Sequence, residues 1–166
     1  MKKAGLDTDI LVALIEKEKE FSIFKPRIFK KENKAYICQK VFAQTLGVLI
    51  HKKDYNIRNA TNKLFDFLRN YKISIIKNSE LDINKLNDLL SELKEKRKNI
   101  KANPDDMDLE IIAVYKLAGI DCIFTINSYH FDELGKYLNM RIEKPMEDVD
   151  MMLRNIFSKK KRLKIN

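Results

Sequence analysis

Two short acidic motifs place a carboxylate where the surrounding apolar pattern calls for a buried residue. They are Leu6-Asp7-Thr8-Asp9-Ile10-Leu11 and Asp108-Leu109-Glu110-Ile111-Ile112-Ala113. A buried carboxylate without a partner costs several kcal/mol, on the order of what a small domain can spare, so such a position usually holds a cation or a proton. The two motifs together therefore predict a site for a divalent metal ion.

The composition favours one domain. A chain of 166 residues that is 45% hydrophobic suits a single core, since domains commonly run to about 100–150 residues. We expect this domain to cover 1–157 and a basic tail to cover 158–166.

No apolar run approaches the ~18 residues that span a bilayer and no signal-peptide pattern follows Met1, which predicts a cytoplasmic protein with no membrane partner. Cys38 and Cys122 are isolated in apolar segments, as is typical of buried thiols in a reducing compartment.

The charge balance is basic. There are 33 Lys and Arg against 24 Asp and Glu, a net charge of +9, which favours a polyanionic partner such as nucleic acid. A solvated basic surface is the alternative explanation of the same balance. The tail could be an arm that contacts RNA phosphates or simply a solvated end. Its candidate contacts are Lys159, Lys160, Lys161, Arg162 and Lys164.

Apolar periodicity predicts that strands alternate with helices along the chain. Such alternation implies an α/β fold whose mostly parallel sheet is covered on both faces and binds ligands at the carboxyl ends of its strands. Asp7 and Asn127 fall at such ends, and the segment 21–34 is expected to be a loop. The expected strands are 4–6, 72–76, 121–126 and an edge strand at 140–142, and the expected helices are 10–15, 41–49, 64–68, 83–93, 104–117, 131–137 and 146–157.

The helix at 104–117 has clear boundary signals. Asn103 is expected to cap it, Pro104 to open it and Gly119 to follow its end. Asp108 lies three residues before Ile111 and four before Ile112, so it shares the inward apolar stripe and should point toward the sheet.

The other acids of this helix have a simpler explanation. Asp105 and Asp106 are expected to complement the positive end of the helix dipole. Glu110 lies on the side opposite to Asp108 and is expected to face solvent.

Gln44 breaks the acidic pattern. It lies three residues after Val41 and four before Val48, on an inward face where a third carboxylate would be expected beside a metal. An amide can bind a ligand water or coordinate through its oxygen, but it adds no negative charge.

These residues resemble the PIN-domain nucleases, the group that includes the VapC-type toxins of toxin and antitoxin pairs. The resemblance spans about residues 4–142. It is carried by the opening motif at 6–11, by Asp108, Ile111, Ala113, Gly119 and Thr125, and by Asn127 with Phe131.

The resemblance implies a flavodoxin-like three-layer sandwich in which acids hold Mg²⁺ or Mn²⁺ for cleavage of single-stranded RNA. It maps the first family acid onto Asp7 and the third onto Asp108. The second and fourth fall on Gln44 and Asn127, which are uncharged, and His130 stands where many relatives carry another acid. The expected function is therefore a metal-dependent ribonuclease with a reduced acidic set. Single-stranded RNA, an antitoxin or other protein, and a second copy of the chain are the partners this implies.

In an active site of this kind, Asp7 and Asp108 would be the catalytic metal ligands, and Asp9 a reserve ligand. Thr8 and Thr125 would orient ligand waters or phosphate oxygens, and Asn127 could ligate through its amide oxygen. His51 and His130 are each isolated in the sequence and are expected to have no ligand role.

Two other interpretations stay open. One is a PIN-like module that binds RNA or protein without cleaving. The other is a haloacid-dehalogenase-like phosphatase, because the motif at 7–11 also resembles that family's opening, with Asp105 and Asp108 as its later acids. Those later acids should follow a buried strand, whereas 94–101 is basic with one apolar residue, which argues against the phosphatase.

Overall fold

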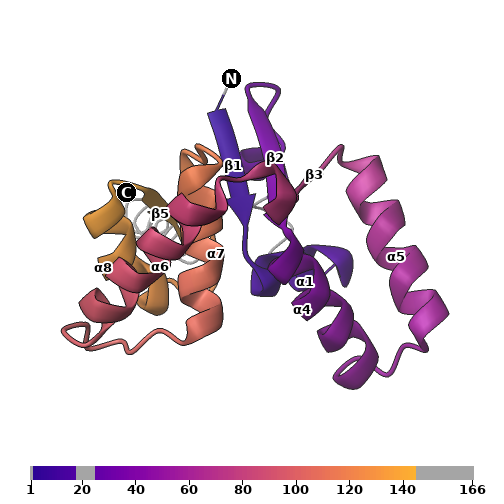
Figure 1. The fold of residues 1–166 in the computed structure, drawn as a ribbon. Helices are drawn as coiled ribbons and strands as arrows, with labels where there is room; N and C mark the ends of the chain where they lie inside the picture. Colours follow the sequence, from indigo (N-terminus) through magenta and orange to yellow (C-terminus); the bar gives the residue numbers. More distant parts are fainter. Residues whose placement is uncertain (1, 18–24, 145–166) are drawn as a thin grey trace, which may run out of the picture.

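The computed structural model describes residues 2–17 and 25–144, and within them a five-stranded sheet is surrounded by helices (Figure 1). Every pair of neighbouring strands is parallel, which confirms the predicted α/β class. The elements are β1 (Lys2–Leu6), α1 (Thr8–Ile15), α3 (Lys25–Ile28), β2 (Asn33–Cys38), α4 (Gln39–His51), α5 (Ile57–Asn70), β3 (Ser74–Ile76), the short 3-10 helix η1 (Asn78–Glu80), α6 (Ile83–Arg97), α7 (Asp106–Leu117), β4 (Cys122–Phe124), α8 (Tyr129–Leu138) and β5 (Arg141–Glu143).

The strand order is β3-β2-β1-β4-β5, so the direction in which successive strands are added to the sheet changes beside β1. The chain moves from β1 to β2 and β3 in one direction and then returns past β1 to β4 and β5. Right-handed crossovers in opposite directions put their helices on opposite faces of a sheet, and in Figure 1 α6, α7 and α8 lie on one side while α1, α4 and α5 lie on the other. The reversal creates a switch point between the carboxyl ends of β1 and β4, the position where such sheets bind ligands.

A close approach between β1 and α7 fixes the centre of the fold. Tyr115 of α7 is fully buried, and its hydroxyl donates to the carbonyl oxygen of Leu6 at 2.5 Å. A Cβ added to Gly5 would lie only 2.8 Å from the Tyr115 ring. The glycine therefore allows the ring to pack against the strand and its hydroxyl to reach the carbonyl of Leu6, the residue before Asp7.

The prediction for the segment between the first two sheet strands was incomplete. The loop expected at 21–34 contains α3 in its described part, and β2, which no sequence pattern had predicted, begins at its end. β2 passes into α4 with no residue between them. Because the short apolar run of β2 merges with the first helical turn, neither period stands out in the sequence.

The predicted start of α7 was wrong by two residues. Asn103 has a left-handed backbone with φ of 45° and does not cap the helix. The cap is Asp105, whose side chain accepts hydrogen bonds from the amides of Met107 and Asp108, while Asp108 accepts from the Asp105 amide in return. The other end was predicted correctly, since α7 ends at Leu117 and Gly119 follows with φ of 67°. Asp108 is thus placed by a capping box as well as by helical period.

Several predictions fall on parts of the chain that the structure does not describe. The helix expected at 146–157, and with it the boundary between domain and tail, lie outside the described residues, as do all the basic side chains of 158–166.

None of the helices in the described part is long and apolar enough to cross a membrane. Cys38 and Cys122 are buried free thiols, as predicted, and burial raises the pKa of Cys38 to about 11.

Gly47 leads to a first testable prediction. It lies inside α4, and a Cβ at this position would meet no atom within 4 Å. Gly47→Ala is expected to stabilise the protein by about 0.5–1 kcal/mol, because glycine is a poor helix former. For a chain of this size the melting temperature should rise by about 1–4 °C, measured by circular dichroism.

The matched control is the glycine inside α8. A Cβ at Gly135 would lie 2.6 Å from Cγ1 of Ile142, so Gly135→Ala should lower the melting temperature. A lower melting temperature for Gly47→Ala would show that space at Gly47 is needed for folding, contrary to the structure.

Candidate functional site at the carboxyl end of the sheet

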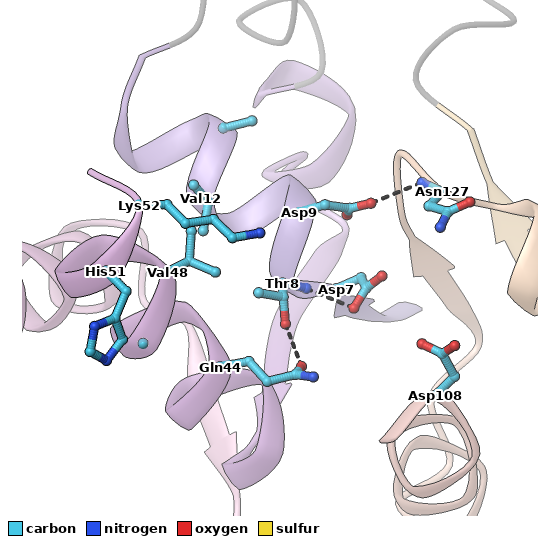
Figure 2. Close-up of a pocket in the computed structure, with 12 residues that line it drawn as sticks. Asp7, Thr8, Asp9, Val12, Gln44, Val48, His51, Lys52, Asp108 and Asn127 are labelled. Carbon is cyan, nitrogen blue, oxygen red and sulfur yellow. Dashed lines mark hydrogen bonds between the residues drawn. The ribbon is translucent and has the colours of Figure 1, made fainter. Parts of the chain in front are cut away.

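A pocket of about 630 Å³ lies at the switch point between β1 and β4. Its walls come from the start of α1, one face of α4, the first turn of α7 and the loop after β4 (Figure 2). A volume of this size is typical of ligand sites. One end of the pocket is acidic and the other is mostly apolar, and the two ends are described in turn.

Asp7 is the most deeply placed acid of the pocket. It follows β1 directly, caps α1 and is 8% exposed. One carboxylate oxygen accepts from the Thr8 amide at 2.7 Å, and the other accepts from the Thr125 hydroxyl at 2.9 Å. Burial, and after it the negative charge of Asp9, raise the pKa of Asp7 to about 7. A carboxyl group in this state is suited to hold a proton or a cation.

Thr125 has a different contact from the predicted one. Its fully buried hydroxyl donates to Asp7, so in this structure it orients a carboxylate and does not face the open pocket.

Asp9 fastens the loop after β4 to α1. Its Oδ2 accepts from the amides of Ile126 at 3.0 Å and Asn127 at 2.8 Å, and the Thr125 hydroxyl lies 3.3 Å away. These contacts had no sequence signal, because 118 residues separate Asn127 from Asp9. They hold the exposed Asn127 at the rim of the pocket, where sequence reasoning had placed it.

Asp108 approaches from the opposite wall. It lies across the pocket from Asp7 in Figure 2, as its inward helical position predicted. Burial first and the charge of Asp105 second raise the pKa of Asp108, and the charge of Asp108 in turn contributes to raising the pKa of Asp7. The two acids therefore repel each other across one pocket, which is the electrostatic condition for binding a cation.

His130 is not isolated, contrary to the sequence-based expectation. Its Nδ1 lies 2.8 Å from Oδ2 of Asp108. The contact arises because α8 packs beside α7, a relation that the spacing of the two residues in sequence does not reveal. The resemblance had given one signal, since His130 stands where relatives carry an acid.

Glu110 also differs from its expected environment. Its carboxylate pairs with the ammonium of Lys40 at 2.8 Å and its side chain is 30% exposed. It is therefore partly buried against α4 and is not fully solvated.

Gln44 lies in the pocket where a third carboxylate was expected. Its Oε1 accepts from the Thr8 hydroxyl at 2.7 Å, and its Nε2 lies 3.2 Å from the sulfur of Met107. Thr8 therefore orients the amide, and the amide links α1 to the start of α7. The position was predicted correctly, and the contacts were not.

The apolar end of the pocket was missed by sequence reasoning. α1 contributes Val12 and Ala13, and α4 contributes Gly47 and Val48. The exposed His51 and Lys52 close this end. Helical spacing could have found it, because positions four and eight residues after Gln44 lie on the same face of a helix.

The donor set fits a divalent cation held largely by water. Among residues 2–17 and 25–144, no three His, Cys, Asp or Glu side chains are grouped to hold a metal ion. Mg²⁺ commonly binds through one or two carboxylates and keeps several waters. Asp7 and Asp108 match that pattern, because burial raises the pKa of both and, in this part of the chain, Asp7 has no cationic partner.

The fold is shared with chains of bacterial VapBC complexes. A chain of VapBC2 from Rickettsia felis bound to a DNA fragment from their promoter matches with a TM-score of 0.64 and 20% identity, covering 86% of this chain and 98% of that one. A chain of VapBC-1 from nontypeable Haemophilus influenzae matches with a TM-score of 0.65 and 11% identity, covering 87% of this chain and 98% of that one. A chain of DNA-bound VapBC from Salmonella typhimurium matches with a TM-score of 0.58 and 15% identity, covering 87% of this chain and 99% of that one.

These matches confirm the predicted sandwich architecture over most of the chain. At such low identity they establish the fold alone. No protein-family model matches the sequence, and no curated protein matches it. Activity must therefore be argued from the pocket.

Proposed function

We propose that this chain, which has the fold of the PIN-domain proteins, is a divalent-metal-dependent ribonuclease that cleaves single-stranded RNA in the cytoplasm. The observation that carries the proposal is the meeting of Asp7 and Asp108 at the switch point of the sheet, with the pKa of both carboxyl groups raised. Acids with shifted pKa values in a pocket are a physical mark of a functional site. The basic net charge of +9 fits a polyanionic substrate.

In this proposal Asp7 and Asp108 hold Mg²⁺ or Mn²⁺. The bound ion would supply charge neutralisation at the phosphodiester and a water of lowered pKa. The protein's own contribution is positioning. Thr125 and the Thr8 amide fix Asp7, while His130 and the Asp105 amide fix Asp108.

Asp9 and Asn127 have supporting parts in the proposal. Asp9 adds negative charge beside Asp7 but is already engaged by the loop after β4, so it is assigned as a reserve ligand. The side chain of Asn127, at the exposed rim, is placed to contact a phosphate oxygen or the ion through its amide.

The neutral amide at Gln44 leads to a prediction about rate. We expect wild-type cleavage to be weak and better supported by Mn²⁺ than by Mg²⁺. Mg²⁺ gives up its water ligands reluctantly, whereas Mn²⁺ binds the donors of the protein more readily. Gln44→Glu is expected to raise the rate at limiting Mn²⁺ about 10-fold, since it adds the missing charge and can still accept from Thr8. Cleavage of a fluorescent single-stranded RNA on denaturing gels measures the change.

Two controls make the rate measurement specific. Gln44→Met removes the polar amide without adding charge and should not raise the rate, and Asp108→Asn should abolish cleavage. If neither wild type nor Gln44→Glu cleaves under conditions in which an active PIN ribonuclease does, the ribonuclease proposal fails.

A second candidate is a binding module that keeps the groove without cleaving. The two uncharged positions, Gln44 and Asn127, favour it because they leave fewer acids for an ion. A Mn²⁺ soak read by anomalous scattering separates the two functions. An ion beside Asp7 supports the ribonuclease, and its absence at high Mn²⁺ supports the binding module.

The shared fold also suggests a partner. Since the matched structures are VapBC complexes, we propose that this chain acts as the toxin of a toxin and antitoxin pair and assembles as a dimer. Co-expression with proteins encoded beside it, followed by mass measurement of the purified complex, tests this assignment.

A further inference from the structure

We propose that the apolar end of the pocket is a nucleotide subsite, in which Val12 and Val48 contact a base and Lys52 contacts a neighbouring phosphate of the same RNA strand. The inference rests on the proposed function, because the occupant is the RNA whose cleavage is assigned to the acidic end. It adds a binding determinant on the folded domain, separate from the acids and from the basic tail.

The first observation is the open space over α4. Gly47 lies in the interior of the helix, and a Cβ added to it would meet nothing within 4 Å. Its backbone is not left-handed, and no neighbouring group requires its small size. Glycine weakens a helix, so neither packing nor backbone conformation explains this residue. It lines the same pocket as Val12 and Val48 and leaves the space at its own position open.

The second observation is the distribution of charge along the groove. Lys52 follows α4 directly and lines the pocket. Within the described residues no carboxylate pairs with its ammonium, in contrast to Lys40 of the same helix, which pairs with Glu110. In Figure 2 the amino group of Lys52 is directed into the pocket, on the side of Asp9.

The third observation is length. Eight residues separate Gln44 from Lys52, which is about 12 Å along a helix axis. The pocket therefore offers an acidic end, an apolar wall, and the ammonium of Lys52, which is directed from the far end of the pocket back toward Asp9 (Figure 2). A nucleotide combines an apolar base face with anionic phosphates, and stacking or packing of bases on side chains is a common mode of single-strand binding.

Lys52 also has a purely structural explanation that the test must exclude. A cation at the carboxyl end of a helix complements the helix dipole. RNA affinity, and not stability alone, is therefore the quantity to measure.

The experiment measures binding of a fluorescein-labelled hexanucleotide of single-stranded RNA by anisotropy over a salt series. Ca²⁺ replaces Mn²⁺, and gels verify that the RNA stays intact. Gly47→Leu fills the groove and Gly47→Ala is its matched control. Lys52→Gln removes the ammonium. Lys31→Gln is its control because Lys31 is exposed and precedes the amino end of β2, whereas the pocket lies at the carboxyl ends of the strands. Melting curves verify that each variant folds.

The subsite predicts a specific pattern. Gly47→Leu should bind at least 10-fold more weakly than Gly47→Ala. Lys52→Gln should weaken binding about 2- to 5-fold and reduce the magnitude of the log-log salt slope by about 0.7, the value for one phosphate contact on a single strand. Lys31→Gln should change neither quantity.

The outcomes separate this inference from the ribonuclease proposal. RNA binding that depends on Gly47 and Lys52 supports the subsite even if no variant cleaves RNA with Mn²⁺. Cleavage by wild type, with unchanged binding and cleavage in Gly47→Leu and Lys52→Gln, overturns the subsite and leaves the ribonuclease intact. A Gly47→Leu protein that keeps its RNA affinity but loses a co-purifying protein assigns the groove to that protein and also overturns the proposal.

Discussion

Asp7→Asn is expected to abolish metal-dependent RNA cleavage and, at the same time, to stabilise the metal-free protein at pH 8. The loss of rate should be at least about 100-fold, because a ligand of the ion contributes several kcal/mol to stabilising charge in the transition state. The gain in stability follows from the pKa of Asp7, which burial and the charge of Asp9 raise from 3.8 to about 7. Asparagine keeps the shape and can still bond to Thr8 and Thr125.

The sign and size of this stability change follow from proton linkage. Between pH 3.8 and about 7 the folded protein keeps a proton on Asp7 that the unfolded chain has released, so stability falls as pH rises through this window. Above it, the ionised carboxylate opposes folding by about 4 kcal/mol, since each whole pKa step is about 1.4 kcal/mol. Urea denaturation at pH 5 and pH 8 should show a gain of about 2–4 kcal/mol for Asp7→Asn at the higher pH and a smaller gain at the lower.

Two controls test whether the effect belongs to this site. Asp88→Asn changes an exposed acid of α6 and should leave both quantities near wild type. Mn²⁺ should stabilise the wild type, by about 2.7 kcal/mol at 100 times its Kd, and should not stabilise Asp7→Asn. Equal stability of wild type and variant at pH 8 would mean that Asp7 is well solvated and that its buried position is incorrect.

Gly5→Ala is expected to destabilise the protein by about 2 kcal/mol, which corresponds to a fall of about 4–8 °C in the melting temperature. The new methyl group would lie 2.8 Å from the ring of Tyr115, which is fully buried and cannot move aside freely. The change should also disturb the hydrogen bond from Tyr115 to the Leu6 carbonyl, next to Asp7.

A double-mutant cycle with Tyr115→Leu measures this contact directly. Tyr115→Leu alone should destabilise, because it removes the hydroxyl and part of the ring. In its presence Gly5→Ala should cost less than it does alone, so the two effects should fall short of their sum. Strictly additive effects would show that the methyl group and the ring do not meet.

The architecture was largely predictable because most elements carry a single clear period. The apolar stripes of α4 and α6 and the end of α7 at Gly119 needed only local rules. β2 escaped because its six residues adjoin α4 without a turn. Asn103 was mistaken for a cap because two capping residues, Asn103 and Asp105, lie on either side of Pro104, and composition alone does not decide between them.

The site was predictable only in part, for a reason of distance along the chain. Asp7, Gln44 and Asp108 were found because each occupies an inward position that its own element defines. The contacts of Asp9 and His130 cross between elements, and no local pattern reports them. Lys52 was missed because an exposed lysine at a helix end has no unusual signal until the groove beside it is known.

The strand order has a consequence for synthesis of the protein. β1 occupies the middle of the sheet, but its neighbour β4 and the Thr125 hydroxyl that orients Asp7 come 118 residues later. At about 5–20 residues per second, the ribosome takes about 6–24 s to make that interval. Until then one edge of β1 is unpaired and Asp7 stands in water beside only part of its pocket. A nascent chain that has not yet reached β4 therefore lacks part of the pocket, which is completed only when β4 joins the sheet.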